Sequence, residues 1–276
     1  MEIAQLSPNV AKVPKNLRCL LIGASEAGKS TWIASLIKNK ATIFHQPGYS
    51  KFIYCSPNFG KSALNSAGDL SYQNKLKEWA QPVEIIFVDH ILTEEELFEE
   101  ADATSGRILL IVDDFSQEMF STPLVYRLFT RLSSHNGIDT CISLHQGAAS
   151  KAFGKWYTLV QQNSNFLVLF RNIANRAAIG KISQQIFPRS KNFLQRCLDE
   201  VTNICGTYSY IFVDADLKNP LNIKFGVRAN IFEENNLPML MMKNPPTYHY
   251  KRTIKKLNQH LQKLCLFIQD IVFKMF

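Results

Sequence analysis

A glycine-rich segment followed by lysine and serine stands near the start of the chain. Residues 17–31 read LRCLLIGASEAGKST, with the spacing Gly-x4-Gly-Lys-Ser. Glycines let a backbone approach a phosphate closely, and the amides of such a loop and of the helix after it point at the anion. The lysine reaches the β- and γ-phosphates, and the hydroxyl next to it binds Mg²⁺. The sequence therefore predicts a nucleotide-binding segment formed by Gly23, Ala24, Ser25, Glu26, Ala27, Gly28, Lys29, Ser30 and Thr31.

Two adjacent carboxylates follow a second apolar run, and they supply what a phosphate-binding loop lacks for hydrolysis. Residues 108–112 read ILLIV and precede Asp113 and Asp114. We expect Asp113 to hold Mg²⁺ together with Ser30, as the Walker B aspartate, and Asp114 to act as the general base toward water. With Lys29, these two residues form the predicted catalytic set. Asp89 also ends an apolar strand, but His90 and a helix cap follow it, so Asp89 ranks below Asp113.

Three further positions are candidates for sensing or stabilising the transferred phosphoryl group. His145 and Gln146 follow the apolar run 138–144, and a polar residue there can sense a γ-phosphate; the sequence does not decide between the two. Arg171 and Arg176 are candidates for an arginine finger, supplied from the same subunit or a neighbouring one.

Strands and helices that could position these residues alternate along the chain. Apolar runs predict strands at 17–22, 51–58, 83–89, 107–115, 138–146 and 165–172, and a hairpin formed by 208–216 and 222–232. Helical patterns fill 29–39, 72–79, 93–101, 116–132, 176–186 and 190–202, and Thr93 with Glu96 forms a capping box. This alternation predicts an α/β fold with a mostly parallel central sheet flanked by helices, of the RecA-like P-loop NTPase type. Two strands precede Asp113, which suits the additional-strand class of ATPases.

The base of the nucleotide is not specified by any motif. GTPases of the switch type usually carry Asn-Lys-x-Asp, but Leu and Lys follow Asn74-Lys75 here. The sequence therefore disfavours GTP specificity without choosing a base.

The predicted domain organisation has three parts. Residues 1–16 read as an N-terminal arm, 17–232 as the ATPase domain, and 233–276 as a linker and a C-terminal amphipathic helix. The tail carries a heptad stripe, which fits packing on its own domain, self-association or docking on a partner; its members are Ile254, Leu257, Leu261, Leu264, Ile268, Ile271 and Met275. A basic cluster at 251–256 fits either a solvated helix start or a contact with a partner.

Composition limits the environment and the partners of the protein. The 276 residues carry a net charge of +8, which favours a polyanionic partner. The six cysteines show no metal-binding spacing, so we expect reduced, buried thiols. No apolar core of a secretory signal occurs in the first twenty residues, and no apolar run is long enough to span a membrane.

These motifs together resemble the FtsK-HerA superfamily. GASEAGKS, YCSPN, ILLIVDDF, LFTRLSSHNGI, SLHQ, NFLVLFRN and YIFVDAD…VRANIF occur in this order over residues 15–232. The set is most similar to the DNA-packaging ATPases of poxvirus-type viruses, virophages, adintoviruses and Maverick/Polinton elements. His145 aligns with the usual sensor glutamine without a gap, and Gln146 with a one-residue shift. Arg171 matches the arginine-finger region, although the Pro-Arg-Asp that often follows is absent.

The resemblance implies an ATP- and Mg²⁺-dependent motor that feeds double-stranded DNA, independently of its sequence, into viral capsids. It implies a homo-oligomeric ring, capsid proteins as partners, no membrane span, and a location in the host nucleus, a cytoplasmic virus factory or the virion rather than secretion. A capsid-independent DNA pump of the same superfamily and a nucleotide-dependent assembly scaffold remain alternatives. A small-molecule kinase is disfavoured because no arginine-rich lid is visible.

Overall fold

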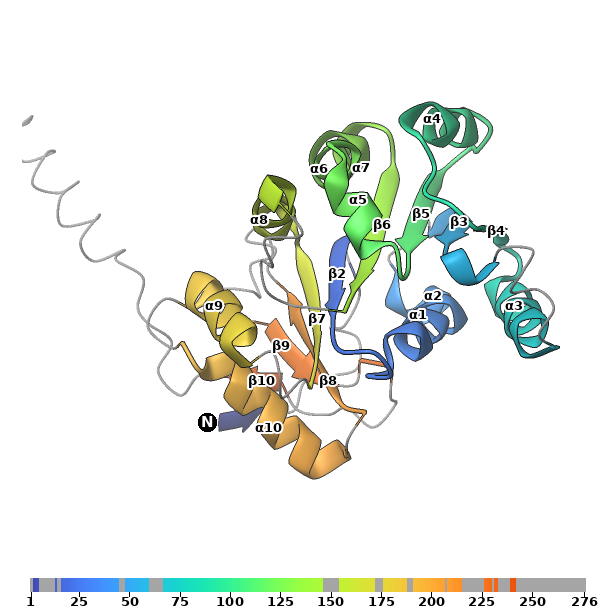
Figure 1. Cartoon of the computed structure of the whole chain (residues 1–276). Helices are drawn as coiled ribbons and strands as arrows, with labels where there is room; N and C mark the ends of the chain where they lie inside the picture. The colour runs from blue at the N-terminus through green and yellow to red at the C-terminus, as the bar shows by residue number, and fades with distance from the viewer. Residues whose placement is uncertain are drawn as a thin grey trace, which may run out of the picture. The chain divides into compact units, whose positions relative to one another are not determined.

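A sheet of ten strands forms the centre of the computed structural model (Figure 1). The structure describes residues 2–4, 13, 16–44, 48–59, 67–145, 154–171, 176–187, 191–206, 208–214, 226–229, 231–232 and 239–241. The strands in these ranges are β1 (Glu2–Ala4), β2 (Arg18–Ile22), β3 (Tyr49–Cys55), β4 (Glu84–Val88), β5 (Arg107–Val112), β6 (Ile138–Leu144), β7 (Phe166–Phe170), β8 (Tyr210–Asp214), β9 (Gly226–Ala229) and β10 (Met239–Met241). Their order in the sheet is β1-β10-β9-β8-β7-β2-β6-β5-β3-β4.

The central part of the sheet is parallel, as the alternation of strands and helices predicted. Strands β4, β3, β5, β6, β2 and β7 are parallel neighbours. Strand β6 lies between β2, which leads into the glycine-rich loop, and β5, which leads into Asp113. The fold is thus that of a P-loop NTPase with an additional strand between these two. Strands β5, β6 and β7 are buried along almost their whole length because helices cover both faces of a parallel sheet.

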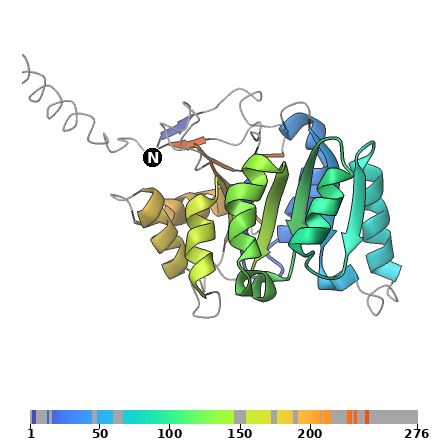
Figure 2. The ribbon, with the colours of Figure 1, turned by 90° about the horizontal axis from the view of Figure 1, so that it is seen from above.

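Helices form a layer on each side of the parallel strands (Figure 2). Their bounds are α1 (Lys29–Lys38), α2 (Lys40–Ile43), α3 (Ala67–Ala80), α4 (Glu94–Asp102), α5 (Ser116–Ser121), α6 (Leu124–Arg127), α7 (Ser133–His135), α8 (Gly154–Asn163), α9 (Arg176–Ile186) and α10 (Phe193–Cys205). Helices α1 and α3 cover one face, and α4, α5 to α7 and α8 cover the other. Thr93 and Glu96 form the predicted capping box of α4. No helix in the described ranges is long and apolar enough to cross a bilayer.

Two helical regions differ from the sequence prediction. The single helix predicted over 116–132 is broken at Pro123, because a proline disfavours helical backbone at the residue before it; Thr122 accordingly adopts ψ 152. The chain then continues through α6 and a π-helical turn, Leu128–Leu132, into α7. Helix α8 was not predicted.

The sheet continues into an antiparallel part beyond β7. Strands β8 and β9 pair antiparallel, as expected for the predicted hairpin, whose turn lies outside the described residues. Strands β10 and β1 then add to β9, so Glu2 pairs with Met241. The sheet therefore includes three residues of the predicted arm and three of the predicted linker, and the described residues belong to one compact unit, Met1–Met241. The predicted tail helix lies outside the described residues.

Four of the cysteines, Cys19, Cys55, Cys141 and Cys197, are buried and form no disulfide, as predicted. Burial raises the pKa of Cys55 and of Cys197 to about 12, so both remain protonated thiols. They act as apolar core residues.

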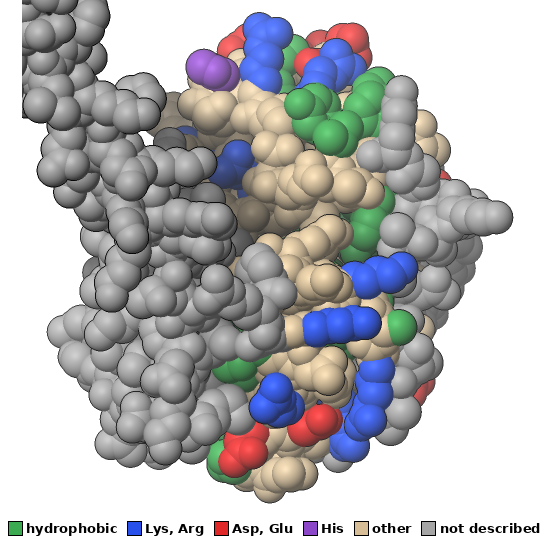
Figure 3. Space-filling view, turned by 90° about the vertical axis from the view of Figure 1, so that its left-hand side faces the viewer, with side chains coloured by type: hydrophobic (Ala, Val, Ile, Leu, Met, Phe, Trp, Pro, Cys, Tyr) green, Lys and Arg blue, Asp and Glu red, His purple; other side chains and the backbone are tan. Residues whose placement is uncertain are grey.

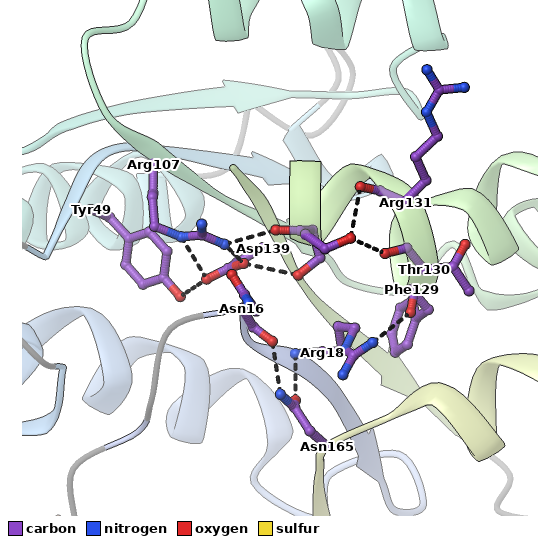
Figure 4. A network of polar contacts seen from close by, with 11 residues as sticks. Asn16, Arg18, Tyr49, Arg107, Phe129, Thr130, Arg131, Asp139 and Asn165 are labelled. Atoms are coloured by element: carbon purple, nitrogen blue, oxygen red, sulfur yellow. Dashed lines mark hydrogen bonds and ion pairs between the residues drawn. The ribbon is translucent and has the colours of Figure 1, made fainter. Parts of the chain in front are cut away.

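A buried polar cluster joins the amino ends of three neighbouring strands (Figure 4). The Asp139 carboxylate, at the start of β6 and 1% exposed, forms an ion pair with Arg107 at the start of β5. It also accepts hydrogen bonds from the hydroxyls of Tyr49 (2.7 Å) on β3 and Ser133 (3.1 Å). We name Tyr49, Arg107, Ser133 and Asp139 the amino-end cluster. It lies at the opposite end of the strands from the glycine-rich loop.

Candidate functional site

The glycine-rich loop connects the carboxyl end of β2 to the first residue of α1, and two glycines are needed for its path. A Cβ atom on Gly23 would lie 2.8 Å from the Cβ of Phe170, so a larger residue cannot fit there. Gly28 has φ +97, a left-handed conformation that glycine adopts without strain. The loop therefore turns sharply and brings its backbone to the N-terminus of α1, where amides favour an anion.

The Lys29 side chain is held by carbonyl oxygens of the glycine-rich loop. It is 6% exposed, and its Nζ donates to the carbonyl oxygens of Gly23 (3.2 Å) and Ala24 (2.7 Å). Desolvation lowers the pKa of Lys29, whereas the charges of Asp113 and Asp114 act to raise it. An ammonium that has lost water in this way gains strongly from an anionic partner such as a phosphate.

Ser30 and Asp113 meet at the start of α1, as the sequence predicted for a Mg²⁺ site. The Ser30 hydroxyl donates to Asp113 Oδ2 at 2.9 Å, and the Tyr54 hydroxyl donates to the same oxygen at 2.9 Å. Asp113 is 4% exposed, and its Oδ1 has no hydrogen-bond partner among the described residues. A buried carboxylate oxygen without a donor, beside a serine hydroxyl, suits a hard cation. Asp113 and Ser30 would hold the ion, and it would neutralise phosphate charge.

Asp114 has a different environment from its neighbour. It has φ +63, and unlike Asp113 it lines the cavity. Its Oδ1 lies 2.6 Å from His145 Nε2, and Asn58 Nδ2 donates to its Oδ2 at 3.4 Å. One carboxylate is thus buried toward the metal position while the other faces the space where water and phosphate could meet.

His145 follows β6 and links the loop to Asp114. Its Nδ1 lies 3.2 Å from Ser25 Oγ and 3.4 Å from Lys29 Nζ. Of the two predicted sensor candidates, His145 therefore lies in the site. Gln146 lies outside the described residues.

The two arginine candidates do not line the described cavity. Arg171 follows β7 directly, and its Nε is buried with no partner among the described residues. Arg176 begins α9 and lies 3.8 Å from the Asp199 carboxylate of α10. Asp89, the alternative carboxylate, ends edge strand β4 and pairs with His90, two strands away from β5.

A cavity of about 760 Å³ extends from the loop along α1. Lys29, Ser30, Asp114 and His145 line its polar end. Aromatic side chains form another part of its wall; these are Trp32, Phe170, Tyr208, Tyr210 and Phe232. The sequence analysis did not find this aromatic wall, because its members come from α1, β7, β8 and the segments flanking β8 and β9. Tyr54 was also missed; its only signal is its place near the end of a strand that adjoins β5.

Comparisons with known proteins give little further information. No protein-family model and no curated protein matches the sequence. Among solved structures, the cytoplasmic domain of the type VII secretion ATPase EccC of Thermomonospora curvata is 17% identical, with a TM-score of 0.36 over 63% of this chain and 20% of that chain. ATPases 2 and 3 of EccC, in complex with a signal sequence peptide, are 19% identical, with a TM-score of 0.33 over 59% and 30%. This chain thus spans less than a third of either protein. These low values carry no functional argument.

Proposed function

We propose that this protein is a Mg²⁺-dependent ATPase motor that packages double-stranded viral, or viral-like transposon, DNA into capsids. The observation that carries the ATPase part is the convergence of Lys29, Ser30, Asp113 and Asp114 at one edge of an additional-strand sheet. The packaging part rests on the order and spacing of the motifs that resemble FtsK-HerA packaging ATPases. Location in the host cell or virion, assembly as a ring and contact with capsid proteins belong to the same proposal.

Each residue of the site has a distinct task in the proposed reaction. Loop amides and Lys29 hold the phosphates, and Ser30 and Asp113 hold the metal ion. Asp114 accepts a proton from the attacking water while the water oxygen bonds to the γ-phosphorus. The bond between that phosphorus and the β-γ bridging oxygen breaks, and ADP and phosphate are released. His145 keeps Asp114 oriented through the contact of 2.6 Å. An arginine, Arg171 or Arg176, completes the site from a neighbouring subunit.

The aromatic wall supports a nucleoside triphosphate over an inorganic phosphate as ligand. Tyr208 is 76% exposed and lies beside the loop, with its Cδ1 4.0 Å from a Cβ placed on Gly28. A base can stack on such a ring, which contributes about 1–3 kcal/mol per base. ATP is the proposed nucleotide.

Replacing Tyr208 should separate binding of the base from binding of the phosphates. We expect Tyr208→Ala to weaken ATP binding about 5- to 100-fold, from the loss of stacking. Affinity for inorganic tripolyphosphate should stay unchanged; titration calorimetry measures both. Ile204→Ala, which removes another exposed apolar side chain near the end of α10, is the control. Equal losses for ATP and tripolyphosphate would show that Tyr208 does not contact the base.

The charge of the protein is consistent with a DNA substrate. The net charge is +8, and Lys and Arg side chains are spread over the described part of the face in Figure 3, among uncharged surface and several Asp and Glu side chains. Contacts between such side chains and DNA phosphates do not depend on the base sequence. They weaken as the salt concentration rises, because salt cations compete for the phosphates. A packaging motor needs this kind of contact because it must accept any sequence.

The decisive experiment measures ATP hydrolysis with and without long double-stranded DNA across a range of salt. We expect DNA to stimulate hydrolysis, and the stimulation to fade between about 50 and 200 mM salt. Lys29→Ala should abolish turnover because the phosphates lose their buried cation. Lys38→Ala, at the other end of α1, is the matched control and should leave the rate unchanged.

Other outcomes would contradict parts of this proposal. ATP binding and oligomers without DNA-stimulated turnover would favour an assembly scaffold. DNA-stimulated turnover in a protein that fails to fill capsids on reconstitution would favour a capsid-independent pump.

A further inference from the structure

Tyr54 stands beside the metal position without a role in the reaction described so far. It lies on β3, next to β5, and it is 1% exposed. Its hydroxyl donates to Asp113 Oδ2, the oxygen that also accepts from Ser30. The ring packs edge-on against Phe59 at 5.0 Å between centroids and against Phe87 at 6.2 Å. The side chain therefore cannot rotate away from the carboxylate without displacing its neighbours.

The two donors to Asp113 Oδ2 differ in what a bound metal ion would do to them. Ser30 is itself a metal ligand in the proposed function, and its hydroxyl lone pair would then turn toward the ion. The Tyr54 hydroxyl has no such second task. It donates its proton in a hydrogen bond to the carboxylate, so the neutral phenol is the form that contacts Asp113. Tyr54 is thus the donor that can remain on Oδ2 while Oδ1, which lacks a partner among the described residues, faces the ion or its water.

A second tyrosine continues the contact toward helix α3. The Tyr72 hydroxyl donates to the Ser30 carbonyl oxygen at 3.3 Å and lies within hydrogen-bonding reach of the Tyr54 hydroxyl. Ser30 of α1 and Tyr54 of β3 thus donate to Asp113 through neutral hydroxyl groups, and Tyr72 of α3 contacts both of these residues. The two hydroxyl donors orient the carboxylate without adding a positive charge of their own.

We propose that Tyr54 is a positioning residue for the metal ion, which fixes the Asp113 carboxylate through Oδ2 so that Oδ1 is presented to Mg²⁺. This inference rests on the proposed function, since it assigns a second layer of contacts to the same nucleotide site. Outer contacts of this kind typically change metal affinity about 10- to 100-fold when they are removed. They act on the metal ion and leave metal-free nucleotide binding to the loop and Lys29.

The test compares affinity for a non-hydrolysable ATP analogue in Mg²⁺ and in EDTA, by titration calorimetry. The ratio of the two affinities is the contribution of the metal. In Tyr54→Phe we expect that ratio to fall about tenfold or more, with the EDTA affinity unchanged. The Mg²⁺ concentration that half-activates hydrolysis should rise correspondingly.

Tyr49→Phe provides a closely matched control. Tyr49 is a buried tyrosine on the same strand, and it donates to a buried carboxylate, Asp139, at 2.7 Å. That carboxylate lies at the opposite end of the sheet, so Tyr49→Phe should alter stability but leave the Mg²⁺ ratio at the wild-type value. An equal fall of the ratio in both variants would mean a general loosening of the fold and would overturn the proposal.

The remaining outcomes separate this inference from the proposed function. A wild-type protein that binds no ATP analogue in either condition contradicts the proposed function itself. Wild-type dependence on Mg²⁺ with an unchanged ratio in Tyr54→Phe overturns only the role of Tyr54. Should Tyr54→Phe fail to fold, Tyr72→Phe, at a half-buried position, should lower the ratio in the same direction. An unchanged ratio in Tyr72→Phe would then contradict the proposal.

Discussion

Asp114→Asn is expected to lower the rate of ATP hydrolysis about 10²- to 10⁴-fold while ATP affinity stays near the wild-type value. The substitution removes the group that accepts the proton, and general-base catalysis contributes about this factor. Asparagine is the informative replacement because Asp114 has φ +63, which asparagine tolerates better than most residues. It also keeps an oxygen that can accept from His145 Nε2. Steady-state turnover and equilibrium binding, measured on the same preparation, separate the two effects.

Asp89→Asn is the control for this prediction. Asp89 is the other aspartate that follows an apolar strand, but β4 is the edge strand of the sheet. We expect wild-type turnover in Asp89→Asn. Full activity in Asp114→Asn would refute the assignment of the general base. Loss of activity in Asp89→Asn alone would indicate that the metal site lies at the edge of the sheet, beside β4.

Asp139→Ala is expected to lower the free energy of unfolding by about 3–5 kcal/mol, the cost of breaking a buried ion pair by removing one partner. The change removes the acceptor of the Tyr49 hydroxyl and the carboxylate partner of Arg107, which keeps a hydrogen bond to the Ser133 carbonyl oxygen. Urea unfolding at neutral pH, followed by circular dichroism, measures the loss. Asp139→Asn retains one acceptor oxygen and should lose less.

An exposed ion pair gives the comparison for this variant. Asp199 lies 3.8 Å from Arg176 on the surface, where pairs contribute about 0–1 kcal/mol. Asp199→Ala should therefore change stability little. A loss in Asp139→Ala no larger than in Asp199→Ala would show that the amino-end cluster does not stabilise the fold.

The stability difference between the wild type and Asp139→Asn should change with pH in a defined direction. Burial raises the pKa of Asp139 above its ordinary value of 3.8, although Arg107 and Tyr49 act to lower it. A carboxyl group with a raised pKa contributes stability below its ordinary value, and this contribution is lost as pH rises through the folded pKa. Relative to Asp139→Asn, the wild type should therefore gain stability as pH falls toward 3.8. Protonation of Asp139 is thus not a cause of unfolding in acid.

The parts of the site that sequence predicted share one property: a single local segment determines their geometry. The loop from Gly23 to Ser30 places its lysine and serine by its own backbone, and Asp113 follows directly from an apolar strand. Strand order could also be anticipated, because two strands precede Asp113 and parallel connections follow strict handedness.

Contacts between distant strands could not be predicted in the same way. The hydrogen bond from Tyr54 to Asp113 depends on β3 lying beside β5 with Cys55 opposite Val112. The aromatic wall depends on Tyr208 and Phe232, which lie about two hundred residues from the loop in sequence. The choice between His145 and Gln146 depends on the residue at which β6 ends. A pattern of apolar residues does not locate the end of a strand to a single residue. The roles of His145, Arg171 and Arg176 stay predictions.

The amino-end cluster affects the register of neighbouring strands as well as the stability of the fold. Strands β3, β5 and β6 each carry one member of this cluster within one residue of their first position and one residue of the nucleotide site within one residue of their last. The two ends lie about 17–20 Å apart along an extended strand. Slippage by one residue would turn every side chain of a strand to the opposite face. The ion pair of Asp139 with Arg107 and its hydrogen bond from Tyr49 tolerate no such slip, so together they fix the register of three strands whose other ends carry Tyr54, Asp113 and His145.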